Sequence, residues 1–595
     1  MATKKFKRAK MVAWFNPVQL VQTGYELFIS SVFGKHADRR LLDAALNPEG
    51  KEVFYDFSNE REDDFWIDYI SDVGDGWDST YGMARLLGKA ELNFDASLGQ
   101  KEDGEYKTKR GNILVFGGDE VYPTAGHSAY KQRLVEPYKA AFSESVTTSS
   151  PTVFAIPGNH DWYDSLVSFS ARFLRQIKFA GWMTLQQRSY FAIKLKEGWW
   201  LFGTDMQLSS ALDRPQMDYF DKIVKNHFSE GDSIILCNAE PHWIFSKLHE
   251  DDSGATARAM GYFEGQILKR KVAVYLAGDL HHYRRHSNDK LGKHKITSGG
   301  GGAFLHPTHD GDVKEIGKQN IYQLKKAFPD EETSRSLTRW NLLFPFINPL
   351  FGIATGLLYL LTAQAFFADI GKFGLPEIGS ALHTVATTAI AKPFALFWVI
   401  LILGGFMMFT DTHSKWYRYV MSPIHGFVHL AATFFASWGI AYWISGGQGI
   451  DTNSIPQILL VGLLIFAAGW LIGSLIMGLY LYVSLNVFGR HSNEAFSSLS
   501  IPDYKNFIRI KINTNGDLEL FPVGVDRIPR KWKETGATDG SAKFDPDDSR
   551  STDPKLIEQP FEIKKRPPRP ASMPKQTPVK SLKRSRTKVC EEKHE

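Results

Sequence analysis

Four long apolar segments in the second half of the chain constrain its fold more than any other feature. They span about Leu342–Ala368, Pro393–Thr410, Met421–Ile444 and Ile458–Leu485, and none contains Lys, Arg, Asp or Glu. Each approaches or exceeds the ~20 residues that a helix needs to cross a bilayer. Buried helices of soluble proteins rarely avoid charge over such a length. The pattern predicts four transmembrane helices and a membrane bilayer as one partner of the chain.

The composition changes abruptly near Trp340, and a chain of 595 residues is too long for one hydrophobic core. We expect an amphipathic and basic segment (1–60), a soluble domain (61–325), the four transmembrane helices (340–488), a cytoplasmic β segment (489–532) and a disordered basic tail (533–595). The β segment is predicted as a hairpin, because two alternating strands flank Asn515-Gly516.

Loop charge predicts the orientation of the membrane region. Lys415 and Arg418 lie between the second and third segments, Arg490 follows the fourth, and 445–457 has no basic residue. Basic loops stay on the cytoplasmic side, so both termini and the soluble domain are expected in the cytoplasm. The connection between the first and second segments, with two lysines, is an exception.

Net charge and cysteine content argue against a nucleic-acid-binding protein and against a disulfide-stabilised fold. The net charge of +5 is small for this length and gives no nucleic-acid signature, so no nucleic acid is expected as a partner. The two cysteines, Cys237 and Cys590, exclude a disulfide framework. The oligomeric state stays unknown.

Two smaller features allow two interpretations each. Pro17–Phe33 reads as an amphipathic helix, for which core packing is the default role and lying on a membrane surface the alternative. His425 and His429 lie on one face of the third apolar segment. They form either a proton, metal or haem site or hydrogen-bonded residues of the bundle interior.

Polar residues follow five apolar strands in the first half of the chain. The strands are 65–71, 112–116, 152–156, 233–236 and 272–276, and the residues that follow them include Asp72, Asp119, Asn159, His160, Asp161, His242, Asp279 and His281. Because the carboxyl ends of strands line the ligand crevice of α/β proteins, these side chains should converge. Oxygen ligands mixed with imidazole suit two ions such as Mn, Fe or Zn, which together can clamp a phosphate and activate water.

These blocks resemble those of the calcineurin-like metallophosphoesterase superfamily. The spacing is closest to the purple acid phosphatase type: Asp72-x-Gly74, Gly118-Asp119-x-x-Tyr122, Gly158-Asn159-His160-Asp161, Ala239-x-x-His242 and Gly278-x-x-His281. The resemblance covers roughly 64–309 and does not extend to the membrane part. It implies an α/β fold of the αββα sandwich type, followed by the all-α transmembrane region and the β hairpin.

The resemblance also implies a dinuclear metal site. One ion would be held by Asp72, Asp119, Tyr122 and His281, and the other by Asp119, Asn159, His242 and Asp279. His160 would stabilise or protonate the leaving oxygen, and Asp161 would orient His160. The nucleophile would be metal-bound hydroxide.

Two departures from the family pattern leave the metals open. Asp279 stands where the family has histidine, which favours Mn, Fe or Mg over Zn; alternatively Asp279 lies outside the ligand set and His282 replaces it. Gly74 stands where the commoner pattern has a histidine ligand, so Tyr122 becomes the replacement. A tyrosinate ligand favours ferric iron.

The leading functional interpretation is a membrane-anchored enzyme that hydrolyses a phosphomonoester, phosphodiester or pyrophosphate, on a phosphorylated small molecule or a lipid-linked substrate. The first alternative is a non-catalytic membrane sensor or scaffold that uses the domain to bind a ligand. Because Asp119, Asn159, His160 and Asp161 are all present, catalysis is favoured. A channel or transporter is a third reading, which the uncharged segments disfavour.

Overall fold

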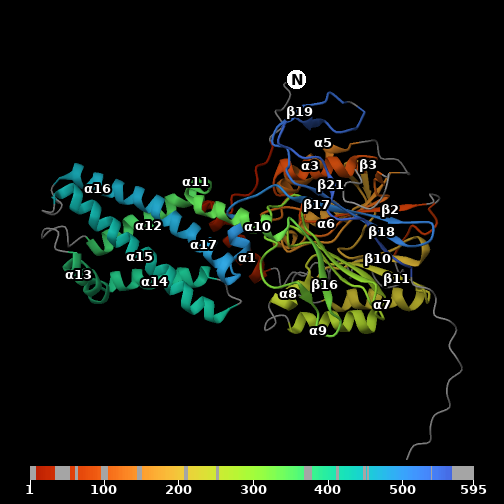
Figure 1. Cartoon of the computed structure of the whole chain (residues 1–595), viewed down its shortest axis with the longest axis horizontal. Coiled ribbons are helices and arrows are strands. Elements are labelled where there is room, and N and C mark those ends of the chain that lie inside the picture. The colour runs from red at the N-terminus through yellow and green to blue at the C-terminus, as the bar shows by residue number, and fades with distance from the viewer. Residues whose placement is uncertain are drawn as a thin grey trace, which may run out of the picture.

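The computed structural model describes residues 8–33, 54–60, 64–94, 105–143, 150–206, 212–248, 254–367, 378–410, 414–446, 451, 454–537 and 539–565. It consists of a layered α/β part, called here the sheet domain, and an elongated bundle formed by helices α12 to α17, called the helical bundle (Figure 1). The bundle projects from one end of the sheet domain.

The first sheet combines strands from both ends of the chain, in the order β21-β18-β17-β2-β5-β6-β8-β7. Its strands are β2 (Phe65–Ile70), β5 (Ile113–Phe116), β6 (Thr152–Ala155), β7 (Lys178–Phe179), β8 (Trp182–Thr184), β17 (Lys505–Ile512), β18 (Leu518–Val525) and β21 (Lys555–Leu556), with β22 (Phe561–Ile563) beside β18. Strands β2, β5 and β6 run parallel, so their carboxyl ends meet at one edge.

The second sheet has the order β1-β9-β10-β11-β12-β14-β13-β16-β15. Its strands are β1 (Tyr55–Asp56), β9 (Phe191–Lys194), β10 (Trp199–Gly203), β11 (Ser233–Cys237), β12 (Val272–Ala277), β13 (Tyr283–Asn288), β14 (Lys293–Ser298), β15 (Glu315–Ile316) and β16 (Tyr322–Phe328). Strands β10, β11, β12 and β14 run parallel to one another, whereas β9 and β13, on either side of them, run antiparallel.

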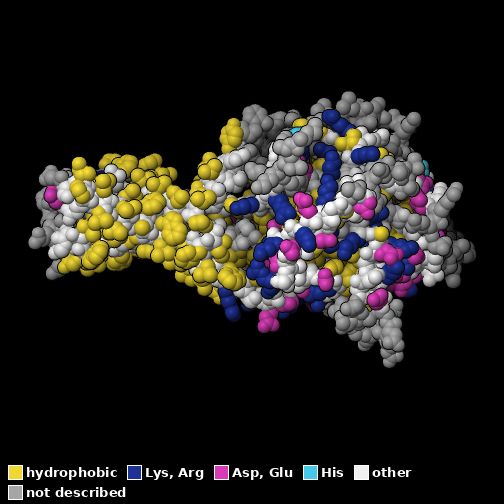
Figure 2. Space-filling model, turned by 90° about the horizontal axis from the view of Figure 1, so that it is seen from above, with side chains coloured by type: hydrophobic (Ala, Val, Ile, Leu, Met, Phe, Trp, Pro, Cys, Tyr) yellow, Lys and Arg dark blue, Asp and Glu magenta, His cyan; other side chains and the backbone are white. Residues whose placement is uncertain are grey.

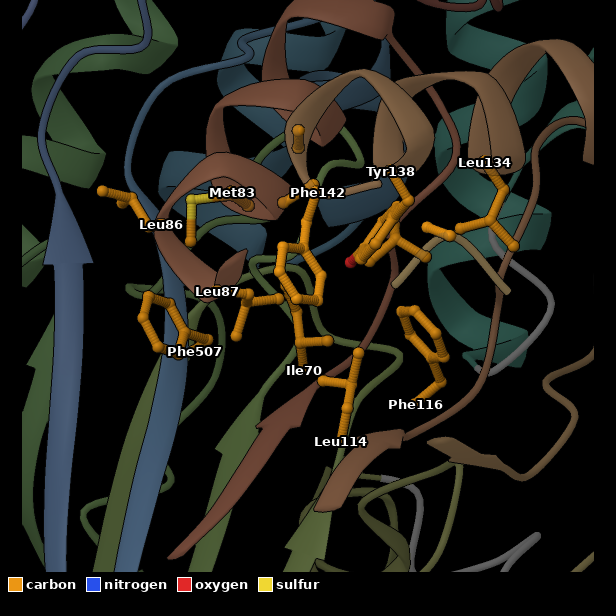
Figure 3. Packing of buried hydrophobic residues seen from close by; sticks show 14 of the residues in the cluster. Ile70, Met83, Leu86, Leu87, Leu114, Phe116, Leu134, Tyr138, Phe142 and Phe507 are labelled. Atoms are coloured by element: carbon orange, nitrogen blue, oxygen red, sulfur yellow. The ribbon is translucent and has the colours of Figure 1, made fainter. Parts of the chain in front are cut away.

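Alternation along the strands produces four layers. In β5, Ile113 and Val115 pack against the second sheet, whereas Leu114 and Phe116 pack against helices on the outer face. Those helices are α3 (Trp77–Gly88), α5 (Glu136–Ala141) and α6 (Val167–Phe173). Figure 3 shows Leu114 and Phe116 below Phe142 and Tyr138 in this outer core. Helices α7 (Arg214–His227), α8 (His242–Leu248) and α9 (Gly254–Tyr262) cover the second sheet, giving an αββα order.

The chain returns to the sheet domain after the helical bundle. The predicted hairpin is confirmed: β17 and β18 pair antiparallel, and β17 also pairs with β2. Residues 533–565, for which the sequence indicated disorder, instead contribute β20 (Phe544–Pro546), β21 and β22. The expectation fails there because apolar residues inside this polar stretch find partners on the sheet domain: the Tyr81 hydroxyl of α3 donates to the Phe544 carbonyl at 2.7 Å. The rest of the predicted tail, 566–595, lies outside the described residues.

Among the described residues, three helices are long and apolar enough to cross a membrane: α12 (Pro349–Phe367), α15 (Lys415–Ser445), and the helix 455–488 made of α16 (Ile455–Ala468) and α17 (Ser474–Phe488). The pair α13 (Ile378–Ala391) and α14 (Pro393–Phe409), bent by 93°, makes a fourth if it counts as one span. Figure 2 shows hydrophobic side chains over the bundle surface, while charged side chains gather on the sheet domain.

The predicted N-terminal helix is present as α1 (Pro17–Phe33), and its default role in core packing does not hold over residues 17–25, whose side chains the structure describes. Val18 and Val21 are 74% and 75% exposed, and Tyr25 is exposed on the same face. On the less exposed face, Gln19 donates a hydrogen bond to Thr23 at 2.9 Å. Over residues 17–25 the helix therefore exposes its apolar side chains, and the helix contacts α12 and residues 161–164.

His425 and His429 of α15 lie inside the bundle. His425 stacks on Tyr480 with a ring separation of 3.9 Å, and His429 Nδ1 lies 3.3 Å from the Tyr359 hydroxyl. Both side chains are buried.

Candidate metal centre

Three aspartates occupy the ends of three parallel strands in the same unusual backbone conformation. Asp72 follows β2, Asp119 follows β5 and Asp279 follows β12, with φ angles of 57°, 54° and 66°. Residues other than glycine rarely adopt the left-handed region, and such conformations concentrate at functional sites. Each strand therefore ends in a turn that presents a carboxylate at the shared edge of the sheets.

The hydroxyl of Tyr122 lies among three of the candidate ligands. It is 3.1 Å from Asp72 Oδ1, 3.2 Å from Asp119 Oδ2 and 3.0 Å from His281 Nε2. Tyr122 itself is 1% exposed. The structure thus brings together the four residues assigned to one ion by the family resemblance.

A backbone carbonyl fixes the orientation of His281. Its Nδ1 lies 2.7 Å from the Phe304 carbonyl, which can only accept, so Nδ1 carries the hydrogen. In the neutral ring Nε2 is then the free lone pair, and it lies 3.7 Å from Asp72 Oδ1. Burial lowers the pKa of His281 well below its ordinary value, which favours this neutral, ligand-ready form.

Negative charge is crowded in the centre. Burial raises the pKa of Asp72 well above its ordinary value, and the charges of Asp119 and Asp279 raise it further. Burial likewise raises the pKa of Asp119, followed by the charge of Asp161. Repelling carboxylates in a buried place, with an imidazole lone pair beside them, form a donor set that suits divalent or trivalent cations.

The loop after β6 places Asn159 and His160 against Asp119. The His160 backbone N–H donates to Asp119 Oδ1 at 2.9 Å, and Asn159 Nδ2 donates to the Tyr163 hydroxyl at 3.2 Å. A Cβ on Gly158 would overlap the Asp119 carboxylate, so only glycine permits this close approach. The backbone of this loop is thereby held against the Asp119 carboxylate.

Glu240 belongs to the centre, although the sequence did not single it out. After burial, the charge of Glu240 is the largest contribution that raises the pKa of Asp279, and it also raises that of Asp119. The charge of Glu240 therefore acts on both aspartates. A signal existed, because Glu240 stands only three residues after the end of β11, nearer the strand end than His242.

His242 points elsewhere. It begins α8, its Nε2 lies 3.7 Å from Glu264 Oε1 and its Nδ1 lies 3.4 Å from Asn238 Nδ2. Glu264 in turn accepts from the Tyr275 hydroxyl at 2.5 Å. The structure thus places His242 beside Glu264 and Asn238, and its assignment to the second ion stays a prediction.

His160 is oriented by a carbonyl rather than by Asp161. His160 Nδ1 lies 2.6 Å from the Pro123 carbonyl, and the ring packs 4.4 Å from that of Tyr122. Asp161 accepts instead from the backbone N–H of Gly158 at 2.9 Å and from the Tyr130 hydroxyl at 2.5 Å. Asp161 therefore stabilises the loop after β6, and the Pro123 carbonyl determines which ring nitrogen of His160 carries the hydrogen.

His282 and Asp279 have different surroundings, and the choice between them as a ligand stays a prediction. The ring of His282 is fully buried, and its pKa is lowered well below the ordinary value by burial and by the charges of Arg284, His306 and His286. These neighbours are basic groups. The Asp279 backbone N–H donates to both Asp72 oxygens at 3.1 and 3.0 Å, which places Asp279 beside Asp72.

A lysine from beyond the helical bundle also reaches the centre. Lys505, on β17, is fully buried and donates to the Ala303 carbonyl at 2.5 Å. Burial lowers its pKa to about 7, while the charges of Asp503, Asp75 and Asp72 raise it. In the described part of the chain, no three His, Cys, Asp or Glu side chains converge tightly enough to hold an ion alone. Asp72, Asp119 and His281 are brought together by their shared contact with the Tyr122 hydroxyl.

Comparison with known proteins agrees with this geometry. A search of curated proteins finds no match. Solved structures with a loose likeness include GAP50, the anchor in the inner membrane complex of Plasmodium (11% identity, TM-score 0.30, 44% of this chain and 78% of that one). Others are PhoD (10%, 0.26, 41% and 58%) and a Staphylococcus aureus protein assigned as a 5′-nucleotidase (12%, 0.24, 47% and 58%).

Residues 65–283, which contain every strand end described above, match the calcineurin-like phosphoesterase family model. The chain therefore carries a calcineurin-like phosphoesterase domain over residues 65–283.

Proposed function

We propose that this chain is a membrane-anchored, dinuclear-metal phosphoesterase. The observation that carries the proposal is the cluster around the Tyr122 hydroxyl, where Asp72, Asp119 and His281 all lie within 3.2 Å. The first ion would be held by these four residues. The second would be held by Asp119, Asn159, Asp279 and Glu240, with Asp119 between the two.

Two bound cations would supply an activated water and neutralise the charge of the phosphate. The remaining tasks fall to the protein. His160, whose Nδ1–H is committed to Pro123, presents Nε2 as a hydrogen-bond acceptor or proton acceptor. Burial lowers the pKa of His160, so the neutral ring is favoured at pH 7. We assign His160 to the phosphate side of the site and Asp161 to holding its loop.

The anchoring part of the proposal rests on exposed apolar surface. The bundle surface is hydrophobic, and α1 turns Val18, Val21 and Tyr25 outward next to it. A helix with an outward apolar face is suited to the interfacial region of a bilayer. Together with the basic residues in the loops, this supports four spans with both termini and the sheet domain on the cytoplasmic side.

The test is hydrolysis by the purified full-length chain. With Mn²⁺ added, it is expected to cleave a generic aryl phosphomonoester or a bis-aryl phosphodiester. Asn159→Ala should lower this activity at least about a hundredfold. Loss of the metal ligand displaces the phosphate and so removes stabilisation of the transition state. His227→Asn, on α7, serves as a matched control with unchanged activity. Wild-type activity no greater than that of Asn159→Ala would favour the sensor or scaffold instead. A C-terminal reporter active outside the cytoplasm would overturn the orientation.

A further inference from the structure

Basic side chains gather where the helical bundle meets the sheet domain. Three stretches lead into or out of the bundle there: 333–345 before α12, 414–424 at the start of α15 and 484–493 at the end of α17. None of the three contains Asp or Glu. Their basic residues, called here the basic belt, are Arg335, Arg339, Lys415, Arg418 and Arg490. A surface with this much charge of one sign suits a partner of the opposite sign.

Side-chain contacts place the three stretches at the same level, around the end of α17. Asn486 Nδ2 donates to the Thr338 hydroxyl at 3.0 Å. The Tyr417 hydroxyl donates to the Ser484 hydroxyl at 2.6 Å. Both of these contacts lie within the last two turns of α17, which ends at residue 488. The basic belt is therefore confined to one end of the bundle and is not spread along its length.

Most of the basic belt is available to a partner. Arg335, Arg339 and Lys415 are exposed, and Arg490 is partly exposed. Within the described ranges, no acidic side chain forms an ion pair with any of these four residues. Arg418 differs, because its Nε donates to the Met407 carbonyl at 3.0 Å. Four cations thus lack a paired carboxylate among the described residues.

Exposed aromatic side chains accompany these cations. Trp340 directly follows Arg339, and Trp416 directly follows Lys415. Tyr419 lies further along α15. Each of the three aromatic side chains is more than half exposed. Tryptophan and tyrosine are enriched at membrane–water interfaces, where their rings lie at the level of the lipid headgroups.

Helix α1 begins at the same end of the bundle. The ring of Phe15 lies 5.1 Å from that of Phe344 and 5.6 Å from that of Phe351, at the start of α12. Just beyond Phe15, Val18 and Val21 are exposed. Figure 2 shows the change from the hydrophobic bundle to charged side chains at this junction. The order of apolar bundle, aromatic and basic belt, and charged sheet domain matches hydrocarbon, headgroup and water.

We propose that the basic belt binds the headgroups of anionic phospholipids in the leaflet that faces the sheet domain. The inference rests on the membrane anchoring in the proposed function. Headgroup phosphates would meet the Arg and Lys side chains, while the rings of Trp340 and Trp416 lie beside them. Phosphatidylcholine has a phosphate too, but its ammonium group cancels the charge. Each cation near an anionic membrane surface favours binding about fivefold, so phosphatidylglycerol should be preferred over phosphatidylcholine.

The test measures the binding of individual lipids to the full-length chain in detergent by native mass spectrometry. Wild type should bind phosphatidylglycerol at least about fivefold more tightly than phosphatidylcholine. Arg335→Gln with Arg339→Gln should weaken phosphatidylglycerol binding at least about fivefold and change phosphatidylcholine binding less than about twofold. Lys415→Gln, in a different stretch, should weaken phosphatidylglycerol binding about threefold or more.

A matched control removes the same number of charges from the other side of the sheet domain. Arg214 and Lys225 are exposed on α7, away from the bundle (Figure 1). Arg214→Gln with Lys225→Gln should leave phosphatidylglycerol binding within about twofold of wild type, because exposed ion pairs contribute little. Melting temperatures of both double variants should match that of wild type, since all four side chains are exposed.

The outcomes separate the inference from the function beneath it. Equal binding of the two lipids, or an equal loss in the two double variants, overturns the basic belt as a lipid site and leaves the anchoring standing. Binding of neither lipid contradicts the anchoring itself. Glycerol phosphate, added at the same concentration as the lipid, should not bind to the basic belt. If it binds as tightly as phosphatidylglycerol and Arg335→Gln with Arg339→Gln removes it, the basic belt is a site for a free phosphate, and the lipid proposal is wrong.

Discussion

Arg509 and Asp68 form a buried ion pair, with Nε 3.1 Å from Oδ1, that joins the strand after the helical bundle to the strand at the start of the sheet domain. Both side chains are at most 2% exposed, and 441 residues separate them in sequence. The guanidinium also donates to the Thr108 hydroxyl at 3.1 Å. The sheet domain is therefore completed by chain that has first passed through the helical bundle.

Breaking this pair should destabilise the sheet domain strongly. Asp68→Asn or Arg509→Met alone is expected to cost about 3–5 kcal/mol, because each leaves the other partner buried with incomplete pairing. Thermal unfolding of the detergent-solubilised chain measures the loss. The double variant Asp68→Leu with Arg509→Met should recover much of it, and single variants that melt with wild type would contradict the buried geometry.

Glu240, rather than His242, is expected to contribute to metal binding. Glu240→Gln removes a charge that raises the pKa of Asp119 and Asp279, and should weaken Mn²⁺ binding about tenfold or more, as measured by calorimetry. His242→Asn alters a side chain that faces Glu264, and should change affinity much less. The reverse ranking would support the ligand set implied by the family spacing.

Tyr122 should control the visible spectrum of an iron-loaded protein. Tyr122→Phe removes the hydroxyl among Asp72, Asp119 and His281. A tyrosinate bound to ferric iron absorbs visible light, so this variant should lose that absorption and bind iron about tenfold or more weakly. Tyr163→Phe, which alters a partner of Asn159, is the control and should retain the band. A band unchanged in Tyr122→Phe would remove this residue from the ligand set.

Stability should fall with acid as His286 takes up a proton. Its Nε2–H donates to the Val313 carbonyl at 2.7 Å, and burial, with the charges of Arg284, Lys295 and Arg285, lowers its pKa to about 4. The folded pKa is below the ordinary value near 6.5, so the unfolded chain binds the proton first as pH falls. This group alone should reduce stability by about 1.4 kcal/mol per pH unit between roughly pH 6.5 and 4.

Melting temperatures recorded from pH 7 to 4.5 check the effect of His286. His286→Asn keeps a donor for the Val313 carbonyl and removes the titration, so its melting temperature should depend less on pH. A dependence identical to that of wild type would show that the proton binds elsewhere.

The parts of the site that the sequence predicted are those that strand ends determine. Asp72, Asp119 and Asp279 directly follow, or nearly follow, buried parallel strands, so the sheet edge brings them together whatever the loops do. Glu240 and His242 both follow β11. Which of them turns inward depends on the start of α8, which spacing does not reveal.

The parts of the fold that the sequence did not predict depend on pairing between segments far apart in the chain. The sequence identified the β17–β18 hairpin from its own turn, but its partner β2 lies about 440 residues earlier, and no local pattern names it. The same holds for Phe544, whose place is set by Trp77 and Tyr81 of α3. The exposure of the apolar residues of α1 could not be predicted for another reason. An amphipathic pattern determines which residues share a face, but it does not determine whether protein or lipid covers that face.

The most direct test of the central claim is the number of Mn²⁺ ions bound per full-length chain, with electron paramagnetic resonance to detect their coupling. A dinuclear centre predicts two ions per chain with a spin-coupled signal, and Asp119→Asn should abolish the coupling because the shared carboxylate is altered. Binding of a single uncoupled ion, or of none, would contradict the account.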